Sequence, residues 1–147
     1  MYDFDVKFKK LNEFAKEPYH ASEDAAGYDL FAAIPSPVTI EPGKVEKIST
    51  GIAISLPRGT FGAIFARSGL AIKKGLAPMN KVGVIDADYR GDCIVALHNE
   101  SSEPQTICTG DRIAQLVVLP YVSVNFIETN DLDETERGDG GFGHSGT

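Results

Sequence analysis

Apolar and polar residues alternate along most of the chain, and a hydrophobic period of two is typical of β-strands with one face in a core. The pattern begins at the amino terminus, where every second residue from Tyr2 to Phe8 is apolar and the residues between them are charged. Further short apolar runs predict strands over residues 45–48, 52–56, 61–65, 93–97, 113–119 and 121–127, with Pro120 as a bend between the last two.

Glycine and proline separate these runs at short intervals, as in residues 57–59 and 109–111. Helical spacing is restricted to two short segments, one helical turn over residues 11–15 and a short helix over residues 70–76. Many short strands divided by turns are the pattern of an all-β protein. The sequence therefore predicts an all-β sandwich or barrel.

The length of 147 residues corresponds to one domain, but the composition changes near the carboxyl terminus. Residues 129–136 are acidic and polar, and residues 138–147 contain five glycines. A segment with so few apolar residues cannot bury enough surface to order itself. We expect a β domain over residues 1–128 and a flexible, glycine-rich arm over residues 129–147.

The chain has 14 basic and 21 acidic residues, a formal net charge of −7. This balance argues against a polymeric nucleic acid as partner, because such a partner needs a broad cationic surface. A small phosphorylated ligand remains compatible with it, provided that a few arginines and backbone N–H groups converge. The start of the chain has no apolar segment of a secretory signal, and no apolar run is long enough to span a bilayer. We expect a cytoplasmic or otherwise intracellular protein that is not secreted and has no membrane partner.

Cysteine usage agrees with a reducing compartment. Cys93 and Cys108 are too few for a disulfide framework and lack metal-binding spacing, and each lies in an apolar run. Both are expected to be buried free thiols. The sequence also lacks a P-loop and the signature of zinc-dependent base deaminases.

Two polar segments are candidates for chemistry. Residues 86–92, Asp-Ala-Asp-Tyr-Arg-Gly-Asp, place three carboxylates, an arginine and a tyrosine between two apolar runs. This segment is compatible with a polar hairpin loop, and equally with a carboxylate that activates water beside a tyrosine platform for a sugar or base. Residues 67–69, Arg-Ser-Gly, follow an apolar strand and suit either a simple turn or a phosphate grip, since arginine binds phosphate in a bidentate manner.

Five segments occur in one order within this short chain: AGYDLFAA (26–33), RSGLA (67–71), GVIDADYRG (83–91), GDRIAQ (110–115) and RGDGGFG (137–143). Together they resemble the five motifs of the trimeric deoxyuridine triphosphatases (dUTPases). The resemblance implies a jelly-roll β-sandwich, a homotrimer with active sites at the subunit interfaces, and hydrolysis of dUTP to dUMP and pyrophosphate with Mg²⁺ on the triphosphate. Such an enzyme lowers dUTP and supplies dUMP for dTMP synthesis.

The resemblance also implies roles for individual residues at the nucleoside end of the substrate. Asp86 matches the general base that deprotonates the water attacking the α-phosphorus. Tyr89 matches the tyrosine that lies under the deoxyribose and leaves no room for a 2′-hydroxyl. The uracil pocket is matched by Asn80 and the following hairpin, with Phe142 of the arm stacking over the base; the hairpin residues are Gly83, Val84 and Ile85.

Other matching residues are expected to bind the phosphates. In the body of the domain these are Arg67, Ser68, Gly69 and Gln115, and in the arm they are Arg137, Gly141 and Gly143. Asp29 matches the acidic residue that acts on the metal through water, so Mg²⁺ is held mainly by the substrate phosphates, as its preference for retained waters and phosphate oxygens allows.

Two positions of the fifth motif depart from the family pattern, because His144 replaces a common serine and Asp139 adds a negative charge among phosphate ligands. Two alternative functions lead to different expectations for the sequence. Relatives that deaminate dCTP use a glutamate at the position of Ala96, which disfavours that activity. A regulatory protein without enzymatic activity predicts a damaged catalytic set, whereas the matching residues are all present; a regulatory partner in addition to catalysis stays open.

Overall fold

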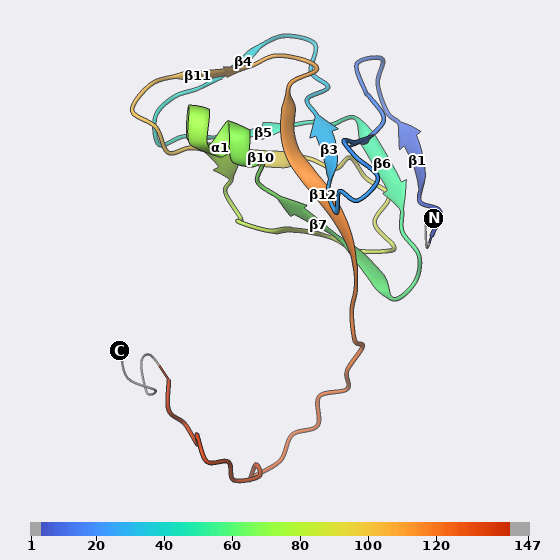
Figure 1. The fold of residues 1–147 in the computed structure, drawn as a ribbon, viewed down its shortest axis with the longest axis vertical. Coiled ribbons are helices and arrows are strands. Elements are labelled where there is room, and N and C mark those ends of the chain that lie inside the picture. The colour runs from blue at the N-terminus through green and yellow to red at the C-terminus, as the bar shows by residue number, and fades with distance from the viewer. Residues whose placement is uncertain (1–3, 142–147) are drawn as a thin grey trace.

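The computed structural model describes residues 4–141, and they form short antiparallel strands with one short helix (Figure 1). The largest sheet has five strands in the order β2-β3-β12-β7-β9. A three-stranded sheet has the order β5-β10-β8, and two further pairs join β1 to β6 and β11 to β4. This arrangement confirms the all-β sandwich expected from the sequence.

The elements have the following bounds: β1 Lys7–Lys10, β2 Tyr19–His20, β3 Tyr28–Phe31, β4 Val38–Ile40, β5 Val45–Ile48, β6 Ile52–Ser55, β7 Thr60–Phe65, α1 Ser68–Lys74, β8 Leu76–Pro78, β9 Gly83–Ile85, β10 Val95–Asn99, β11 Gln105–Ile107 and β12 Arg112–Pro120. The helix ends at Gly75, which has a φ of 64° and donates its N–H to the carbonyl of Ala71. Such a left-handed residue suits glycine, so the chain turns from α1 directly into β8.

The core is aliphatic. Its largest buried side chains are supplied by different strands of the sandwich, which is why apolar residues recur at every second position in the sequence. Each such side chain contributes about 1.5–3 kcal/mol when fully buried. The fully buried aliphatic side chains include Leu30, Ile40, Ile48, Ile52, Leu76, Leu97, Ile107 and Ile113.

Strand β12 organises the main sheet. It pairs with β3 on one side, where Gln115 lies opposite Asp29, and with β7 on the other, where Gln115 lies opposite Phe65. Its residues Ile113, Ala114 and Leu116 are buried in the core. The predicted strand over residues 113–119 is therefore present and central.

The two ends of the described chain depart from the sequence-based strands. Strand β1 begins only at Lys7, pairs with β6, and has all four of its residues exposed. The predicted half-buried strand from Tyr2 is thus wrong in its burial, and Tyr2 itself lies outside the described residues. Residues 121–127 form no strand, since they pair with no other strand in the described part of the chain, and Phe126 is 94% exposed.

Two local expectations are corrected. Residues 11–15 form a turn instead of a helical turn, and the Asn12 carboxamide holds it by accepting the N–H of Phe14 and donating to the carbonyl of Ala33. Cys93 is a buried free thiol as expected, but Cys108 is exposed. The apolar run before Cys108 ends with β11 at Ile107, and Cys108 belongs to the turn closed by the Asp111 carboxylate, which accepts the Cys108 N–H.

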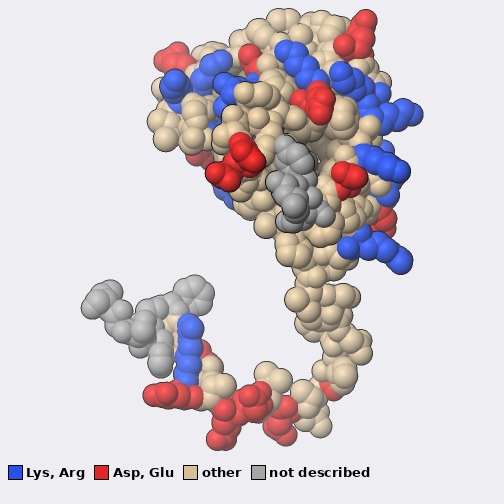
Figure 2. All heavy atoms as spheres, turned by 45° about the vertical axis from the view of Figure 1, so that its right-hand side comes forward, with Lys and Arg blue, Asp and Glu red and all other residues tan. Residues whose placement is uncertain are grey.

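Beyond β12 the chain leaves the sandwich. Tyr121 still donates its N–H to the carbonyl of Gly59, and the following residues lead away from the body (Figure 1). Acidic side chains gather along this extension (Figure 2). The division at residue 128 stays a prediction. No described helix has the length and apolar character needed to cross a membrane.

A buried polar residue gives the fold a direct test. Asn99, the last residue of β10, is 0% exposed, and its amide nitrogen donates to the carbonyls of Ile40 and Glu103, both at 2.8 Å. We predict that Asn99→Ala lowers the free energy of unfolding by about 2 kcal/mol or more, because buried carbonyls lose their donor. Urea denaturation at fixed protein concentration measures this change in the free energy of unfolding.

The matched control is Asn130→Ala, since Asn130 is exposed in the extension. Its effect is expected to lie within about 0.5 kcal/mol. Equal free energies of unfolding for the two variants would contradict this account of the core.

Candidate functional site

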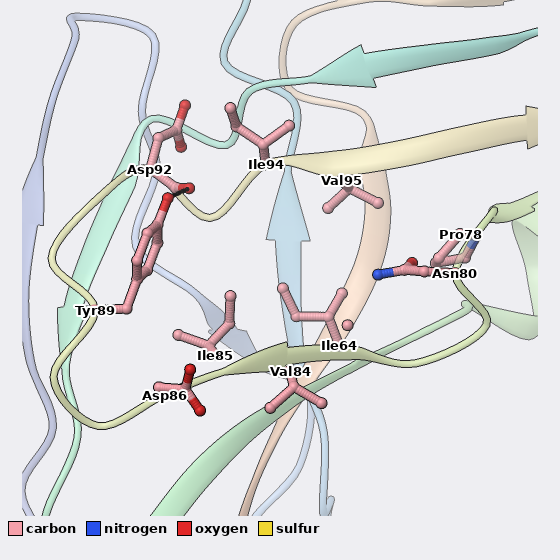
Figure 3. Close-up of a pocket in the computed structure, with 11 residues that line it drawn as sticks. Ile64, Pro78, Asn80, Val84, Ile85, Asp86, Tyr89, Asp92, Ile94 and Val95 are labelled. Atoms are coloured by element: carbon pink, nitrogen blue, oxygen red, sulfur yellow. Dashed lines mark hydrogen bonds between the residues drawn. The ribbon is translucent and has the colours of Figure 1, made fainter.

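A pocket of about 270 Å³ lies between the β9 hairpin and the start of β10 (Figure 3). Asn80 stands at one end, Tyr89 and Asp92 stand at the other, and aliphatic side chains lie between them. An apolar cleft with a few polar groups at its ends suits a small flat ligand. The residues lining it are Ile64, Pro78, Asn80, Gly83, Val84, Ile85, Asp86, Tyr89, Asp92, Ile94 and Val95.

Backbone pairing fixes the Asn80 end of this pocket. The turn between β8 and β9 places Lys81 at a φ of 65°, with its N–H donated to the carbonyl of Pro78. Met79 donates its N–H to the carbonyl of Ala96, which ties the same turn to β10. Strand β9 then pairs with β7, where Gly83 lies opposite Ile64. The Asn80 side chain therefore extends from a rigid turn.

The other end begins where β9 ends. Asp86 is the first residue after the strand, and its carbonyl accepts the N–H of Tyr89 at 3.1 Å. The Tyr89 hydroxyl donates to the Asp92 carbonyl at 3.1 Å. The ring covers Gly91, where a Cβ atom would collide with it. The loop thus brings a carboxylate and an aromatic ring to one wall of the pocket.

Asp86 is also open on a second side. A larger hollow of about 800 Å³, lined mainly by residues 56–61 and 84–90, shares Asp86 and Val84 with the pocket. A group bound in the pocket could therefore extend past Asp86 toward the outside of the hairpin.

The pocket carries negative charge only. Among the described residues that line it, the charged ones are Asp86 and Asp92, and none is lysine or arginine. A polyphosphate placed here would be repelled by two carboxylates unless cations arrived from elsewhere.

A separate group of charges, the arginine cluster, consists of Asp29, Arg67 and Arg112. Arg67 donates from Nε to one Asp29 oxygen at 2.7 Å, and Arg112 donates from Nη1 to the other at 3.1 Å. The two arginines and one carboxylate leave a formal charge of +1. Arg67 keeps part of its guanidinium available, since only Nε bonds to Asp29, and this arrangement suits an anion.

Gln115 and the start of α1 border the arginine cluster. Gln115 lies opposite Asp29 and donates its amide to the carbonyl of Ala66, the residue before Arg67. The Gln115 oxygen lies so close to Gly27 that a Cβ atom there would collide with it. Ser68 and Gly69 are exposed in the first turn of α1.

The structure therefore sorts the expected site residues into two groups. The pocket is lined by Asn80, the 83–85 backbone, Asp86 and Tyr89. The expected phosphate ligands of the body lie in or beside the arginine cluster instead, and none of them lines the pocket. In the arm, Arg137 donates to the carbonyl of Gly140 within a turn, and Gly141 is exposed. Phe142 and Gly143 lie outside the described residues.

Sequence reasoning did not single out Asp92 as a site residue, although it lines the pocket. The third carboxylate of the 86–92 segment was the available signal. Behind it, burial, with a smaller contribution from the Asp92 charge, raises the pKa of the Cys93 thiol to about 11. Cys93 is thus protonated at neutral pH and is no nucleophile, and the carboxylates that line the pocket are Asp86 and Asp92.

Metal ligands are sparse. No group of three or more histidine, cysteine, aspartate or glutamate side chains is arranged to hold a metal ion among residues 4–141. Asp29 accepts one hydrogen bond on each oxygen, and a carboxylate has about four acceptor positions. It is therefore able to accept further bonds from metal-bound water, but the chain forms no metal cage of its own there.

An antiparallel β-sandwich with a pocket of aliphatic and polar side chains, a carboxylate at its rim and a separate arginine cluster suits a phosphorylated small molecule. The dUTPase family model matches residues 14–146, so the chain belongs to the dUTPase family.

Individual relatives agree. The chain is 51% identical over 142 residues to the deoxyuridine 5′-triphosphate nucleotidohydrolase of Desulfitobacterium hafniense, covering 96% of this chain and 94% of that protein. Its structure is similar to that of a variant of the Staphylococcus bacteriophage 80alpha dUTPase with dUpNHpp, with a TM-score of 0.87, 29% identity, and coverage of 97% and 99%. A variant of the dUTPase from phage phi11 of S. aureus, whose structure concerns a structural Mg(II) ion, gives a TM-score of 0.79 and 26% identity, with coverage of 89% and 100%.

Proposed function

We propose that this protein is a dUTP diphosphatase, which hydrolyses dUTP to dUMP and pyrophosphate. The observation that carries the proposal is the single hairpin that places Asn80, Asp86 and Tyr89 around one pocket. The dUTP nucleotidohydrolase to which the chain is 51% identical supports the substrate. A soluble nucleotide as substrate agrees with the intracellular location expected from the sequence.

Asn80 and the β9 backbone are proposed to bind uracil. The side chain of Asn80 offers a donor and an acceptor, and the backbone of Gly83, Val84 and Ile85 lies along the same pocket. Uracil and cytosine present opposite patterns at their 3- and 4-positions, so cytosine would leave polar groups unpaired at about 1–3 kcal/mol each. Phe142 is proposed to cover the base from the arm.

Tyr89 is proposed to lie under the deoxyribose. Its ring is held by the hydroxyl bond to Asp92 and by contact with Gly91, so it forms a fixed wall. A 2′-hydroxyl would have to enter the space that this wall occupies. Selection against UTP follows from shape, without a polar contact to the missing group.

Asp86 is proposed to be the general base. It takes a proton from water, and the resulting oxygen nucleophile forms a bond to the α-phosphorus. The bond from that phosphorus to the bridging oxygen breaks, and pyrophosphate leaves with the electron pair. Because Asp86 stands at the rim, a water molecule has access to it, and positioning of this kind typically contributes about 10²–10⁴ in rate.

The phosphates are proposed to be bound by a second copy of the chain. The pocket has no cation, whereas the arginine cluster has a net positive charge and no pocket residue. We therefore propose a homotrimer in which Arg67, Ser68, Gly69 and Gln115 of one protomer face the pocket of its partner. Arg137, Gly141 and Gly143 of the arm add further donors.

Magnesium fits this site as an ion that arrives on the triphosphate. Asp29 would hold it through water, in keeping with its remaining acceptor capacity. When bound, Mg²⁺ neutralises phosphate charge. Asp86 takes the proton from water, Tyr89 forms the wall beside the sugar, and the arginines bind the phosphates.

Deamination of dCTP has no support in the pocket. Ala96 lies on β10 and carries no carboxylate that could serve as the base of such a reaction. A regulatory role without catalysis would leave Asp86 and Arg67 without a purpose, although a regulatory partner is compatible with catalysis.

The direct test is pyrophosphate release with Mg²⁺ on dUTP, UTP, dCTP and dTTP in parallel. We predict turnover of dUTP alone, since the pocket selects the base at Asn80 and the sugar at Tyr89. Equal turnover of UTP would contradict the role of Tyr89. No turnover of any of the four by the folded protein would contradict the proposed function.

A second prediction concerns the base. Asp86→Asn should lower kcat for dUTP by about 10²–10⁴, because the amide cannot accept the water proton. Binding of a non-hydrolysable dUTP analogue, measured by calorimetry, should stay within about threefold of the original, a shift of at most about 0.7 kcal/mol.

Asp5→Asn serves as the matched control, since Asp5 is exposed and lies outside the pocket. It should retain normal kcat. An Asp86→Asn variant with normal kcat would remove Asp86 from the mechanism.

A further inference from the structure

Asp92 lines the pocket, yet the proposed reaction assigns it no role. We infer that Asp92 is a positioning residue, which anchors the Tyr89 wall to the connection between β5 and β6 and thereby sets the selection of deoxyribose over ribose. This inference rests on the proposed function and names a further determinant of its specificity.

Ser49 is the main anchor of the Asp92 side chain. Its hydroxyl donates to Asp92 Oδ2 and accepts the N–H of Gly51 at 3.0 Å, so both of its functions are used. The Ser49 carbonyl accepts the N–H of Ala33 at 2.8 Å. Ser49, which donates to Asp92, is therefore itself held by the N–H groups of Gly51 and Ala33.

Thr50 supports the neighbouring backbone. It is 1% exposed, and its hydroxyl lies 2.8 Å from the carbonyl of Cys93 and 3.4 Å from Asp92 Oδ1. One hydroxyl proton serves one acceptor, and the shorter contact is the one to Cys93. Cys93 also donates its N–H to Ile52 at 2.9 Å. The residue after Asp92 is thus held by backbone contacts, which leaves Ser49 as the side-chain anchor.

The connection itself has no freedom to move. Gly51 has a φ of 63°, and a Cβ atom there would lie 2.9 Å from Ala15 Cβ. Glycine is required at that place by conformation and by space. The Ser49 hydroxyl therefore projects from a rigid support.

Asp92, which Ser49 holds through its side chain, also binds the tyrosine through its backbone. The Tyr89 hydroxyl donates to the Asp92 carbonyl, and Figure 3 shows the ring extending from its own loop toward Asp92. The Asp92 carbonyl also accepts the N–H of Ile94 at 2.9 Å, so the backbone holds it in place. The Ser49 bond fixes the Asp92 side chain, which lines the pocket at the same end as the ring, and its loss would free that part of the wall. Asp86 directly follows β9, whose pairing with β7 involves neither Ser49 nor Asp92. Asp86 contacts the tyrosine through the Tyr89 N–H, at the backbone end of that residue and away from the hydroxyl.

This separation predicts a change in selectivity without a loss of turnover. The test compares kcat and KM for dUTP and UTP in Ser49→Ala, Asp92→Ala, the double variant and Asp92→Asn. Each single alanine variant should lower the dUTP-to-UTP ratio of kcat/KM about tenfold, the usual consequence of losing one hydrogen bond to a charged group. In Ser49→Ala, whose residue lies outside the pocket lining, the kcat for dUTP should stay within about twofold, since Asp86 keeps its place.

The double variant should be no less selective than either single one, because both remove the same bond. Asp92→Asn should restore most of the selectivity, since its amide oxygen still accepts the Ser49 proton. An unchanged ratio in the alanine variants, additive effects, or an Asp92→Asn variant as impaired as Asp92→Ala would each overturn the inference.

Ser49→Ala keeps the test decisive even if Asp92→Ala does not fold, since it removes the same bond from the other partner and leaves Asp92, which is only partly buried, in place. Measurements on the unaltered protein distinguish failure of the proposed function from failure of the Asp92 positioning role. Failure of the unaltered protein to hydrolyse dUTP would reject the proposed function, whereas normal dUTP hydrolysis with unaltered selectivity in the variants would reject the positioning role alone.

Discussion

The antiparallel pairing of β7 with both of its neighbours is the constraint on which the site depends. On one edge β7 holds β9, and this pairing places the pocket and Asp86 at the end of the hairpin. On the other edge it holds β12, which brings Gln115 beside Asp29. Where β7 ends, Arg67 begins the next segment. One strand thus positions the pocket and the proposed phosphate ligands at the same time.

That arrangement separates charge within a single chain. Two carboxylates and no cation line the described pocket. Arg67 and Arg112 lie in the arginine cluster, where both pair with Asp29. A triphosphate needs both regions, because its nucleoside end suits the pocket and its phosphates require positive charge. The proposed trimer resolves the separation by placing the arginine cluster of one protomer opposite the pocket of its partner.

The sequence predicted β5, β6, β7 and β12 nearly to their bounds, because short apolar runs between turns mark buried strands. It did not predict the shorter strands β2, β3, β4, β8, β9 and β11. It did not predict the exposure of Phe126 or Cys108, since the apolar character of a run does not reveal whether a partner strand exists in the same chain. The motif order indicated Asp86 and Tyr89, whereas Asp92 gained importance only through Ser49, which lies 43 residues away in the sequence.

The most direct test of the shared site mixes two inactive variants. Asp86→Asn lacks the base and Arg67→Gln lacks the phosphate ligand, and the two are produced together so that they form mixed trimers. If base and arginine come from different protomers, random assembly should restore about a quarter of the normal dUTP turnover, because a site needs an intact residue from each of two chains. Mixed trimers as inactive as either parent would show that one chain supplies both residues, and would contradict the account.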